Sequence, residues 1–338
     1  MTIKDVAERA GVSTSTVSIV LNNKGQERKI SEKTQKKIWD VIREMGYHPN
    51  VVAGTLRSNL EERFTYYITI FWTSDERDRI MIRFLRGLQE QIMENNLNCE
   101  LIIKPYINGQ LQEAMTERVL KMCHGIILCN ASEQDMEFID SVDLGKPMVI
   151  YNRYSDNYCS VNIDDQNLGE YAARAFIENK CKKILMLSSP ARFKGMEIRK
   201  EAFENYLFSY QVSKPYLVTG KDTISSGYGL INKVMQDQIE FDSVFCSSDA
   251  IAIGAVRALH EKGVKIPKDV KVIAVGNGDD EQEIYAIPSL SVAKVPIEEM
   301  GKKCIILLYD ILKFRQKEIM RIKVPVEYIA RESCPSVL

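Results

Sequence analysis

Hydrophobic residues follow one spacing at the start of the chain and another after residue 60. In the first 46 residues, apolar side chains recur every three or four positions, which is typical of short helices that bury one face. Two helices are expected on either side of Gly11, because glycine accepts the positive φ at which helices end. Ser13 is placed to cap the second helix, and Ser31 to cap a third that ends at Gly46.

After residue 60, short apolar runs alternate with amphipathic stretches. This alternation predicts an α/β fold of doubly wound parallel sheets. The units are too many for one sheet, so two α/β lobes with a cleft between them are expected. The predicted strands are 66–71, 99–103, 125–129, 147–151, 184–187, 243–246 and 270–275, and the predicted helices are 80–95, 111–123, 168–179, 197–209, 227–238 and 250–262.

Charge is distributed unevenly along the 338 residues. Residues 1–60 hold ten Lys or Arg and six Asp or Glu, a formal charge of +4, whereas the whole chain carries −1. A basic segment before an acidic body suits a DNA-binding domain joined to a regulatory core, because phosphate contacts supply much of the affinity for DNA. Two short helices joined by a tight turn also form the geometry that places a helix in the major groove.

Several classes of protein fit the sequence poorly. Neither a signal peptide nor a membrane span is expected, since no stretch approaches 18 uninterrupted apolar residues. Eight scattered cysteines without a Cys-x-x-Cys pair, and only three histidines, argue against a metal site and favour reduced thiols in a cytoplasmic protein. The acidic pairs Asp164-Asp165 and Asp279-Asp280 are interpreted as hydrogen-bond acceptors. We therefore expect neither an enzyme nor a bound cofactor.

A family resemblance covers essentially the whole chain. The segment 5–22 resembles the N-terminus of the LacI/GalR family of bacterial transcription regulators. The matching residues there are Asp5-Val6-Ala7, Ala10-Gly11-Val12-Ser13, Thr16-Val17-Ser18 and Leu21-Asn22. Later matches are Val161-x-x-Asp164-Asp165-x-x-x-Gly169, the segments 245–255, 260–270 and 287–301, and Arg331-Glu332-Ser333.

The resemblance implies an N-terminal three-helix helix-turn-helix domain at 1–48, a hinge helix or linker at 49–60, and a core at 61–338 that binds an effector and dimerises. This core would be two-lobed and similar to periplasmic binding proteins. The first lobe is expected at about 61–155 and 291–320, and the second at about 156–290 and 321–338. Because no heptad extension follows Ser333, a homodimer is expected rather than a tetramer. The family's members are cytoplasmic and associate with the nucleoid.

The second helix would read DNA. The resemblance assigns base contacts to Thr14, Ser15 and Ile19, with Ser13 as the cap. Ile19 stands where the family usually has Arg, so it would pack on a thymine methyl rather than pair with guanine, unless it packs inward. Phosphate contacts are expected from Thr2, Thr16, Ser18 and Asn22, and from Arg28 and Lys29 in a basic loop that is otherwise a solvated surface.

The segment after the third helix resembles the family's hinge helix, whose pattern is Asn-x-x-Ala-x-x-Leu. Asn50, Ala53, Leu56 and Arg57 are the residues it assigns to DNA, with Leu56 as a wedge between base pairs. Gly54 departs from the pattern and predicts a helix that orders only on DNA. The alternative is a plain linker with an apolar anchor.

Ligands of parallel α/β sheets bind beyond the carboxyl ends of the strands. By that rule the candidates are Trp72, Ser74, Asp75, Asn152, Arg153, the segment 188–193, Asp249 and Asn277. Trp72 is either a plate for a sugar ring or part of the core. The resemblance adds Arg199 and Phe203 from the family's Arg-x-x-Gly-Phe, although Arg199 could instead form a helix-surface salt bridge. The family's ligand-binding Asp is replaced by Gly278, so Asn277 or Asp279 is expected to take its role.

The combined interpretation is an effector-controlled repressor that binds a pseudo-palindromic operator in double-stranded DNA. A small saccharide is the expected effector, and a carbohydrate-utilisation operon the expected target. The alternative within the family is a regulator that needs a purine-like corepressor or a phosphoprotein partner. A solute-binding module for transport is a third possibility, which the N-terminal DNA reader disfavours.

Overall fold

A computed structural model describes residues 3–21, 25, 28–45, 64–74, 78–190, 193–278, 280–315 and 318–336. The expected hinge, 49–60, lies outside these residues. So do eight of the candidate site residues, namely Thr2, Asn22, Asn50, Ala53, Leu56, Arg57, Asp75 and Asp279.

The N-terminal domain has the three expected helices, α1 (Ile3–Ala10), α2 (Thr14–Leu21) and α3 (Glu32–Met45). Gly11 ends α1 at a φ of +64°, as its position predicted. Hydroxyl groups cap the next two helices: Ser13 Oγ accepts from Thr16 N at 3.1 Å and Ser31 Oγ from Thr34 N at 3.2 Å. The three helices enclose a small core of Val6, Ala7, Ala10, Val17, Val20, Ile38, Val41 and Ile42.

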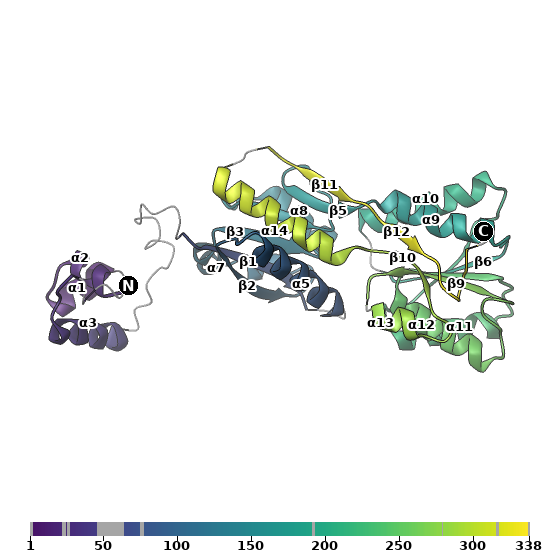
Figure 1. Ribbon diagram of the computed structural model, residues 1–338, viewed down its shortest axis with the longest axis horizontal. Coiled ribbons are helices and arrows are strands. Elements are labelled where there is room, and N and C mark those ends of the chain that lie inside the picture. Colours follow the sequence, from purple (N-terminus) through teal and green to yellow (C-terminus); the bar gives the residue numbers. More distant parts are fainter. Residues whose placement is uncertain are drawn as a thin grey trace.

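The first lobe is built on a six-stranded parallel sheet in the order β11-β5-β4-β3-β1-β2. Helices α5 and α14 pack together on one face (Figure 1). Residues of α6, α7 and α8 belong to a separate hydrophobic cluster on the other face. The lobe comprises β1 (Tyr66–Thr73), α5 (Asp78–Glu94), β2 (Cys99–Tyr106), α6 (Leu111–Ala114), α7 (Glu117–Met122), β3 (Gly125–Cys129), α8 (Glu133–Ser141), β4 (Met148–Tyr151), β5 (Cys159–Ile163), α14 (Ile297–Phe314) and β11 (Arg321–Val324).

The second lobe repeats this plan with the strand order β12-β10-β9-β8-β6-β7, in which only β12 runs antiparallel to its neighbour. Helices α9 and α10 pack as one pair and α11 and α12 as the other. It comprises α9 (Asp165–Glu178), β6 (Ile184–Ser188), α10 (Lys194–Ser209), β7 (Tyr216–Thr219), α11 (Ile224–Gln236), β8 (Ser243–Cys246), α12 (Asp249–Glu261), β9 (Lys271–Gly276), α13 (Asp280–Tyr285), β10 (Ser291–Lys294) and β12 (Glu327–Ile329).

The chain crosses between the lobes three times, each time later than the sequence indicated. Strand β5 pairs with β4 and therefore belongs to the first lobe, not to a second lobe that begins at 156. Strand β10 pairs with β9 in the second lobe, although 291–320 was assigned to the first. Strand β11 pairs with β5, so the last crossing follows Val324 rather than 320. Strand pairing decides these boundaries, and the hydrophobic pattern does not record which strand is the partner.

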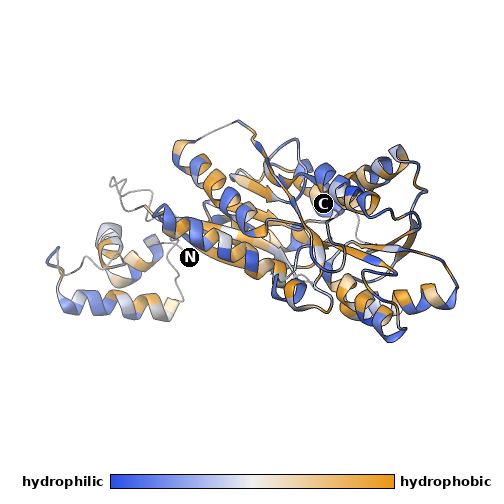
Figure 2. Ribbon diagram, turned by 45° about the vertical axis from the view of Figure 1, so that its right-hand side comes forward, coloured by the Kyte–Doolittle hydropathy of each residue, from blue (hydrophilic) through white to orange (hydrophobic). Residues whose placement is uncertain are grey.

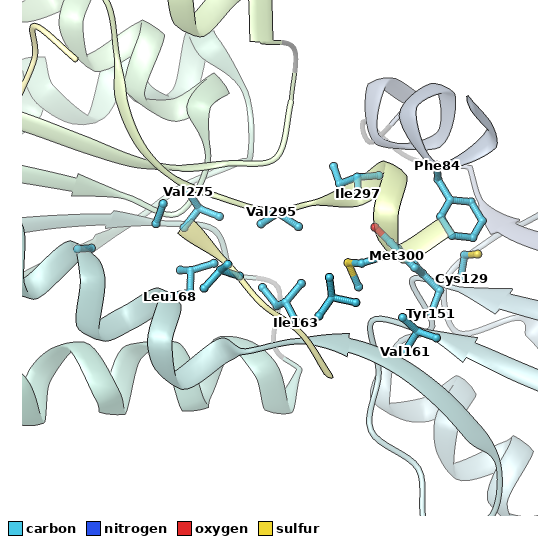
Figure 3. Close-up of a cluster of buried hydrophobic side chains, with 14 of the residues drawn as sticks. Phe84, Cys129, Tyr151, Val161, Ile163, Leu168, Val275, Val295, Ile297 and Met300 are labelled. Carbon is cyan, nitrogen blue, oxygen red and sulfur yellow. The ribbon is translucent and has the colours of Figure 1, made fainter. Parts of the chain in front are cut away.

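A single hydrophobic cluster passes through these crossings. Figure 3 shows it extending from Phe84 and Tyr151 in the first lobe to Leu168 and Val275 in the second, by way of Ile297. In both lobes the central strands are mainly apolar, whereas the outer helices mix hydrophilic and hydrophobic residues (Figure 2). The junction is therefore a packed core, and a ligand between the lobes would rest on it.

Seven of the eight cysteines are buried and Cys99 is half-buried, all as free thiols. Burial raises the pKa of the Cys99 and Cys181 thiols to about 11, so both stay protonated at neutral pH. Within the described segments no helix is both long and apolar enough to cross a membrane.

Candidate DNA-reading helix and effector cavity

Helix α2 presents a polar face to solvent. Its Val17 and Val20 are buried against α1 and α3, which leaves Thr14 and Ser15 exposed on the opposite side. The N-terminal end of such a helix is the part that contacts base edges in the major groove. The short hydroxyl side chains at this end can hydrogen-bond either bases or phosphates.

Ile19 stands on α2 between the buried Val17 and Val20. It is half-buried, and it is absent from the apolar side chains that pack on the core of the N-terminal domain, which are Val12, Ile30 and Met45. Arg28 and Lys29 are both exposed, in a turn where Lys29 has a φ of 55°.

A cavity of about 850 Å³ lies between the lobes, at the carboxyl ends of strands from both sheets. Its floor is apolar and belongs to the shared hydrophobic cluster, with Val275, Val295 and Ile297 among its residues. Its polar wall consists of Asn108, Asn130, Asn152, Arg153, Ser188, Ser189, Glu197, Arg199, Lys200, Thr219, Lys221, Asp222, Ser247 and Asn277. An apolar floor with hydroxyl, amide and guanidinium groups around it suits a small polar ligand with hydrocarbon faces.

Two of the cationic groups in this wall, Arg153 and Arg199, are held in place by hydrogen bonds. Arg199 Nε donates to Asp165, whose side chain is almost fully buried, and the other oxygen of Asp165 accepts from Tyr154 Oη at 2.9 Å. The guanidinium carbon of Arg199 lies 5.6 Å from the centre of the Phe193 ring, and that of Arg153 lies 4.0 Å from the same centre. Two guanidinium groups thus converge on one aromatic ring, and a buried carboxylate holds one of them in place.

Asn152 follows β4 in the left-handed conformation, with a φ of 56°. Asparagine tolerates this conformation better than most residues. Its Oδ1 is buried and has no hydrogen-bond partner among the described residues. A buried acceptor without a partner costs free energy, and in this wall a ligand hydroxyl or amine could satisfy it.

Comparison with known proteins identifies the families of the two domains that carry these sites. Residues 2–50 match the model of bacterial regulatory proteins of the lacI family, and residues 173–334 match that of a periplasmic binding protein-like domain. The probable HTH-type transcriptional repressor ExuR of Bacillus subtilis (strain 168) is 29% identical over 340 residues, which are 98% of both chains. The chain belongs to the LacI family. It is a DNA-binding transcription regulator, from a family of regulators rather than enzymes.

Solved structures share the fold over nearly the whole chain. The lac repressor dimer bound to operator and the anti-inducer ONPF has a TM-score of 0.72 and 20% identity, and covers 99% of both chains. The complex of the transcriptional regulator CelR with cellobiose has a TM-score of 0.70 and 22% identity, and covers 98% of this chain and 99% of its own.

Asn152, Arg153, Arg199 and Asn277, all proposed for the effector, line the cavity of this LacI-family chain. The proposed segment 188–193 also contributes to the lining, through Ser188, Ser189, Pro190 and Phe193. Arg199 forms its salt bridge with a buried carboxylate, so a helix-surface ion pair is wrong as its description. The aspartates of the 164–165 pair are hydrogen-bond acceptors, as expected, since Asp164 also accepts from Asn167 N at 3.1 Å.

Four other candidates do not line the cavity. Trp72 is 3% exposed and packs on Phe84 and Tyr151, so it is core and not a plate for a sugar. Phe203 is buried and stacks on Phe245 with the ring centres 4.6 Å apart. Both are large apolar side chains, and burial stabilises them more than exposure at a wet site would.

Ser74 and Asp249 also lie away from the cavity wall. Ser74 is exposed, and its backbone N donates to Tyr106 O at 2.7 Å. Asp249 is buried at the start of α12, where its Oδ1 accepts from Ala250 N at 2.9 Å. Burial, followed by the nearby Glu283, raises the pKa of Asp249 to about 6.

The family's ligand-binding Asp has no room at position 278. A Cβ on Gly278 would lie 2.2 Å from Asp249 Oδ2, so any side chain there meets a buried carboxylate. The neighbouring Asn277 lines the cavity instead. The glycine at position 278, where the family has Asp, therefore goes together with the buried Asp249 carboxyl that packs against it.

Sequence reasoning missed part of the wall. Asn130 follows β3 with a φ of 57°, so the strand-end rule applied to 125–129 would have found it. Lys221 and Asp222 follow β7, a short edge strand of sequence Tyr-Leu-Val-Thr that was not among the predicted strands. The role of Asp165 as the anchor of Arg199 had no signal either, because it depends on the packing of α9 against α10.

Proposed function

We propose that this chain is an operator-binding repressor of a carbohydrate-utilisation operon, released from DNA when a small saccharide binds between its lobes. The observation that carries the proposal is the cavity of about 850 Å³, in which a buried carboxylate fixes Arg199. Cavities of roughly 300–1,000 Å³ hold small molecules in proteins, so a mono- or disaccharide fits this one.

The chemistry of the wall favours a ligand with many hydroxyl groups. Amides at Asn152 and Asn277 and hydroxyls at Ser188 and Thr219 supply both donors and acceptors. The floor of valine and isoleucine side chains suits the C–H faces of a pyranose or furanose ring. The cellobiose in the CelR complex shows that a disaccharide is bound by a protein of this fold.

On the DNA side, α2 would lie in the major groove of each half-site, with Thr14, Ser15 and Ile19 toward the bases. Thr2, Thr16, Ser18, Asn22, Arg28 and Lys29 would contact phosphates. Two subunits would bind a pseudo-palindromic operator, as the lac repressor dimer binds its operator. The segment 49–60, with Leu56 as the wedge, is proposed to complete the interface in the minor groove.

The first experiment selects genomic fragments of the source organism with the full-length protein at physiological salt and without added ligand. Recovery of a roughly palindromic site is expected, and the flanking genes would indicate the saccharide class. A panel of mono- and disaccharides, with hypoxanthine and guanine beside them, is then screened by thermal shift and by release of the recovered fragment.

Release by a saccharide in the wild type, with loss of that response in Arg199→Gln, supports the proposal. No recovery without ligand, followed by recovery with hypoxanthine or guanine, would replace it with a corepressor-dependent regulator. Saccharide binding without recovery of any fragment would favour a solute-binding module. Turnover of a bound saccharide would show an enzyme.

A further inference from the structure

One buried arginine joins the two lobes beside the cavity. Arg83, on α5 of the first lobe, is only 9% exposed. Its Nη1 donates to the carbonyl oxygen of Gly278 at 2.8 Å, in the loop that follows β9 of the second lobe. Its Nε and Nη2 donate to the two carboxylate oxygens of Glu298, at 2.7 and 2.6 Å, at the start of α14.

The geometry with Glu298 is the bidentate pairing that gives arginine–carboxylate contacts their specificity. Burial lowers the pKa of Arg83, but the hydrogen bonds with Glu298 offset this and the net shift is upward. Burial raises the pKa of Glu298, and its bonds with Arg83 again outweigh that effect, so its pKa is lowered. Both groups are therefore ionised at neutral pH, and the guanidinium is held in one orientation.

The loop 276–278, which accepts a hydrogen bond from Arg83, also packs closely against side chains of the second lobe. A side chain at position 278 would displace Asp249 or the loop, because Asp249 Oδ2 lies 2.2 Å from where a Cβ would stand. At Gly276 the same construction places a Cβ 2.8 Å from Glu283 Oε1. The backbone at 276–278 is thus held between buried carboxylates below and the Arg83 guanidinium above.

A second set of ion pairs continues from the loop into the second lobe. Asp280 Oδ1 lies 3.7 Å from Arg83 Nη1 and is also bonded to Lys294. Lys294 Nζ lies 3.1 Å from Glu283, which in turn accepts from Arg331 Nη1 at 3.3 Å. Buried charges in such a network are costly to leave without their partners, so the members hold one another in place.

Each end of this contact adjoins a residue that lines the cavity. Ile80 precedes Arg83 by about one turn of α5, Asn277 precedes Gly278, and Ile297 precedes Glu298. Helices α5 and α14 also meet at their backbones, since a Cβ on Gly87 would lie 2.0 Å from Glu298 O. A shift of the loop that carries Asn277 would therefore displace groups on both α5 and α14.

We infer that Arg83 is a positioning residue for the effector cavity: it fixes the loop that presents Asn277 and passes any displacement of that loop to α5. The use of this link in regulation rests on the proposed function. The link itself can be tested without any effector, so a failure of one idea is distinguishable from a failure of the other.

The test is hydrogen–deuterium exchange of the full-length protein without ligand, read by mass spectrometry. Arg83→Gln removes the charge and the bidentate pairing, whereas Arg83→Lys can still donate to Gly278 O. Arg86→Gln, at an exposed position of the same helix, is the matched control for lost charge. Exchange in the peptide containing Asn277 and Gly278 should rise at least tenfold in Arg83→Gln and less in Arg83→Lys, and stay unchanged in Arg86→Gln.

A reciprocal variant tests transmission in the other direction, because coupling between two sites is mutual. Gly278→Ala pushes the loop away from Asp249 and should speed exchange in the turn of α5 that contains Arg83. Gly229→Ala is the control, since a Cβ there meets nothing within 4 Å. Unchanged exchange at 277–278 in Arg83→Gln, or an equal rise in α11, would show a purely structural residue and overturn the inference. An unchanged α5 in Gly278→Ala would overturn the transmission.

Discussion

The buried carboxyl of Asp249 predicts a pH dependence of stability that can be calculated. Asp249 is 4% exposed, and burial raises its pKa from 3.8 to about 6, with Glu283 adding to the shift. One pKa unit corresponds to about 1.4 kcal/mol between the two protonation states, so this shift corresponds to roughly 3 kcal/mol. The affected property is the free energy of unfolding between about pH 4 and pH 6.

The sign follows from proton binding. Within this window the folded chain keeps the proton on Asp249 and the unfolded chain has lost it, so stability falls as the pH rises. The penalty is absent below the unfolded pKa and complete above the folded one. Asp249→Asn removes the titration and keeps an oxygen that can accept from Ala250 N. The stability of this variant relative to wild type should therefore increase by about 2.4 kcal/mol from pH 4 to pH 7, because the unfolded chain is already more than half ionised at pH 4.

The assay is urea unfolding of the full-length chain, followed by circular dichroism at pH 4, 5, 6, 7 and 8. Asp237→Asn, at an exposed position at the end of α11, is the control for loss of one surface carboxylate. If the difference between Asp249→Asn and wild type is the same at pH 4 and pH 7, the carboxyl titrates alike in both states and the reasoning is wrong.

Three further predictions concern the sites. Arg199→Gln should weaken calorimetrically measured binding of the saccharide found in the thermal-shift panel at least tenfold, which is about 1.4 kcal/mol. Adding Asp165→Asn to this variant should restore stability without restoring binding. Full binding in Arg199→Gln would contradict the assignment. Ser13→Ala removes a helix cap and should lower the melting stability of the N-terminal domain by about 1 kcal/mol, with weaker fragment binding in gel shift; an unchanged melt would argue against the cap. Ile19→Arg should shift the sites selected from random DNA toward guanine at one position per half-site, and unchanged site preference would show that position 19 does not face the bases.

Local sequence was sufficient for the N-terminal domain. Its helices are short, their caps are serines within three residues of the amides they accept from, and Gly11 stands at the one turn that needs a positive φ. All these interactions join residues close in sequence, so spacing and residue type reveal them. The central strands of both sheets were also evident, because strands buried on both faces form continuous apolar runs.

The same reasoning predicted only some of the residues that line the cavity. The strand-end rule found Asn152, Arg153 and Asn277, since parallel strands bring their carboxyl ends to one edge. It failed for Trp72, because β1 extends to Thr73 and Trp72 therefore lies within the buried part of the strand rather than beyond its end. Whether a residue at a strand end faces the cavity or the core depends on the helix packed beside it, and no local pattern carries that information.

The remaining features belong to the tertiary structure alone. The assignment of β5, β10 and β11 to their lobes follows from which strands they pair with, and for β11 that partner lies far away in the chain. Arg83 and Gly278 are 195 positions apart, and the local sequence around either residue does not predict their hydrogen bond. The close contact that a Cβ at position 278 would make likewise involves a carboxylate on another element. Sequence spacing specifies which segments form helices and strands, but only the folded chain brings distant groups within hydrogen-bonding range.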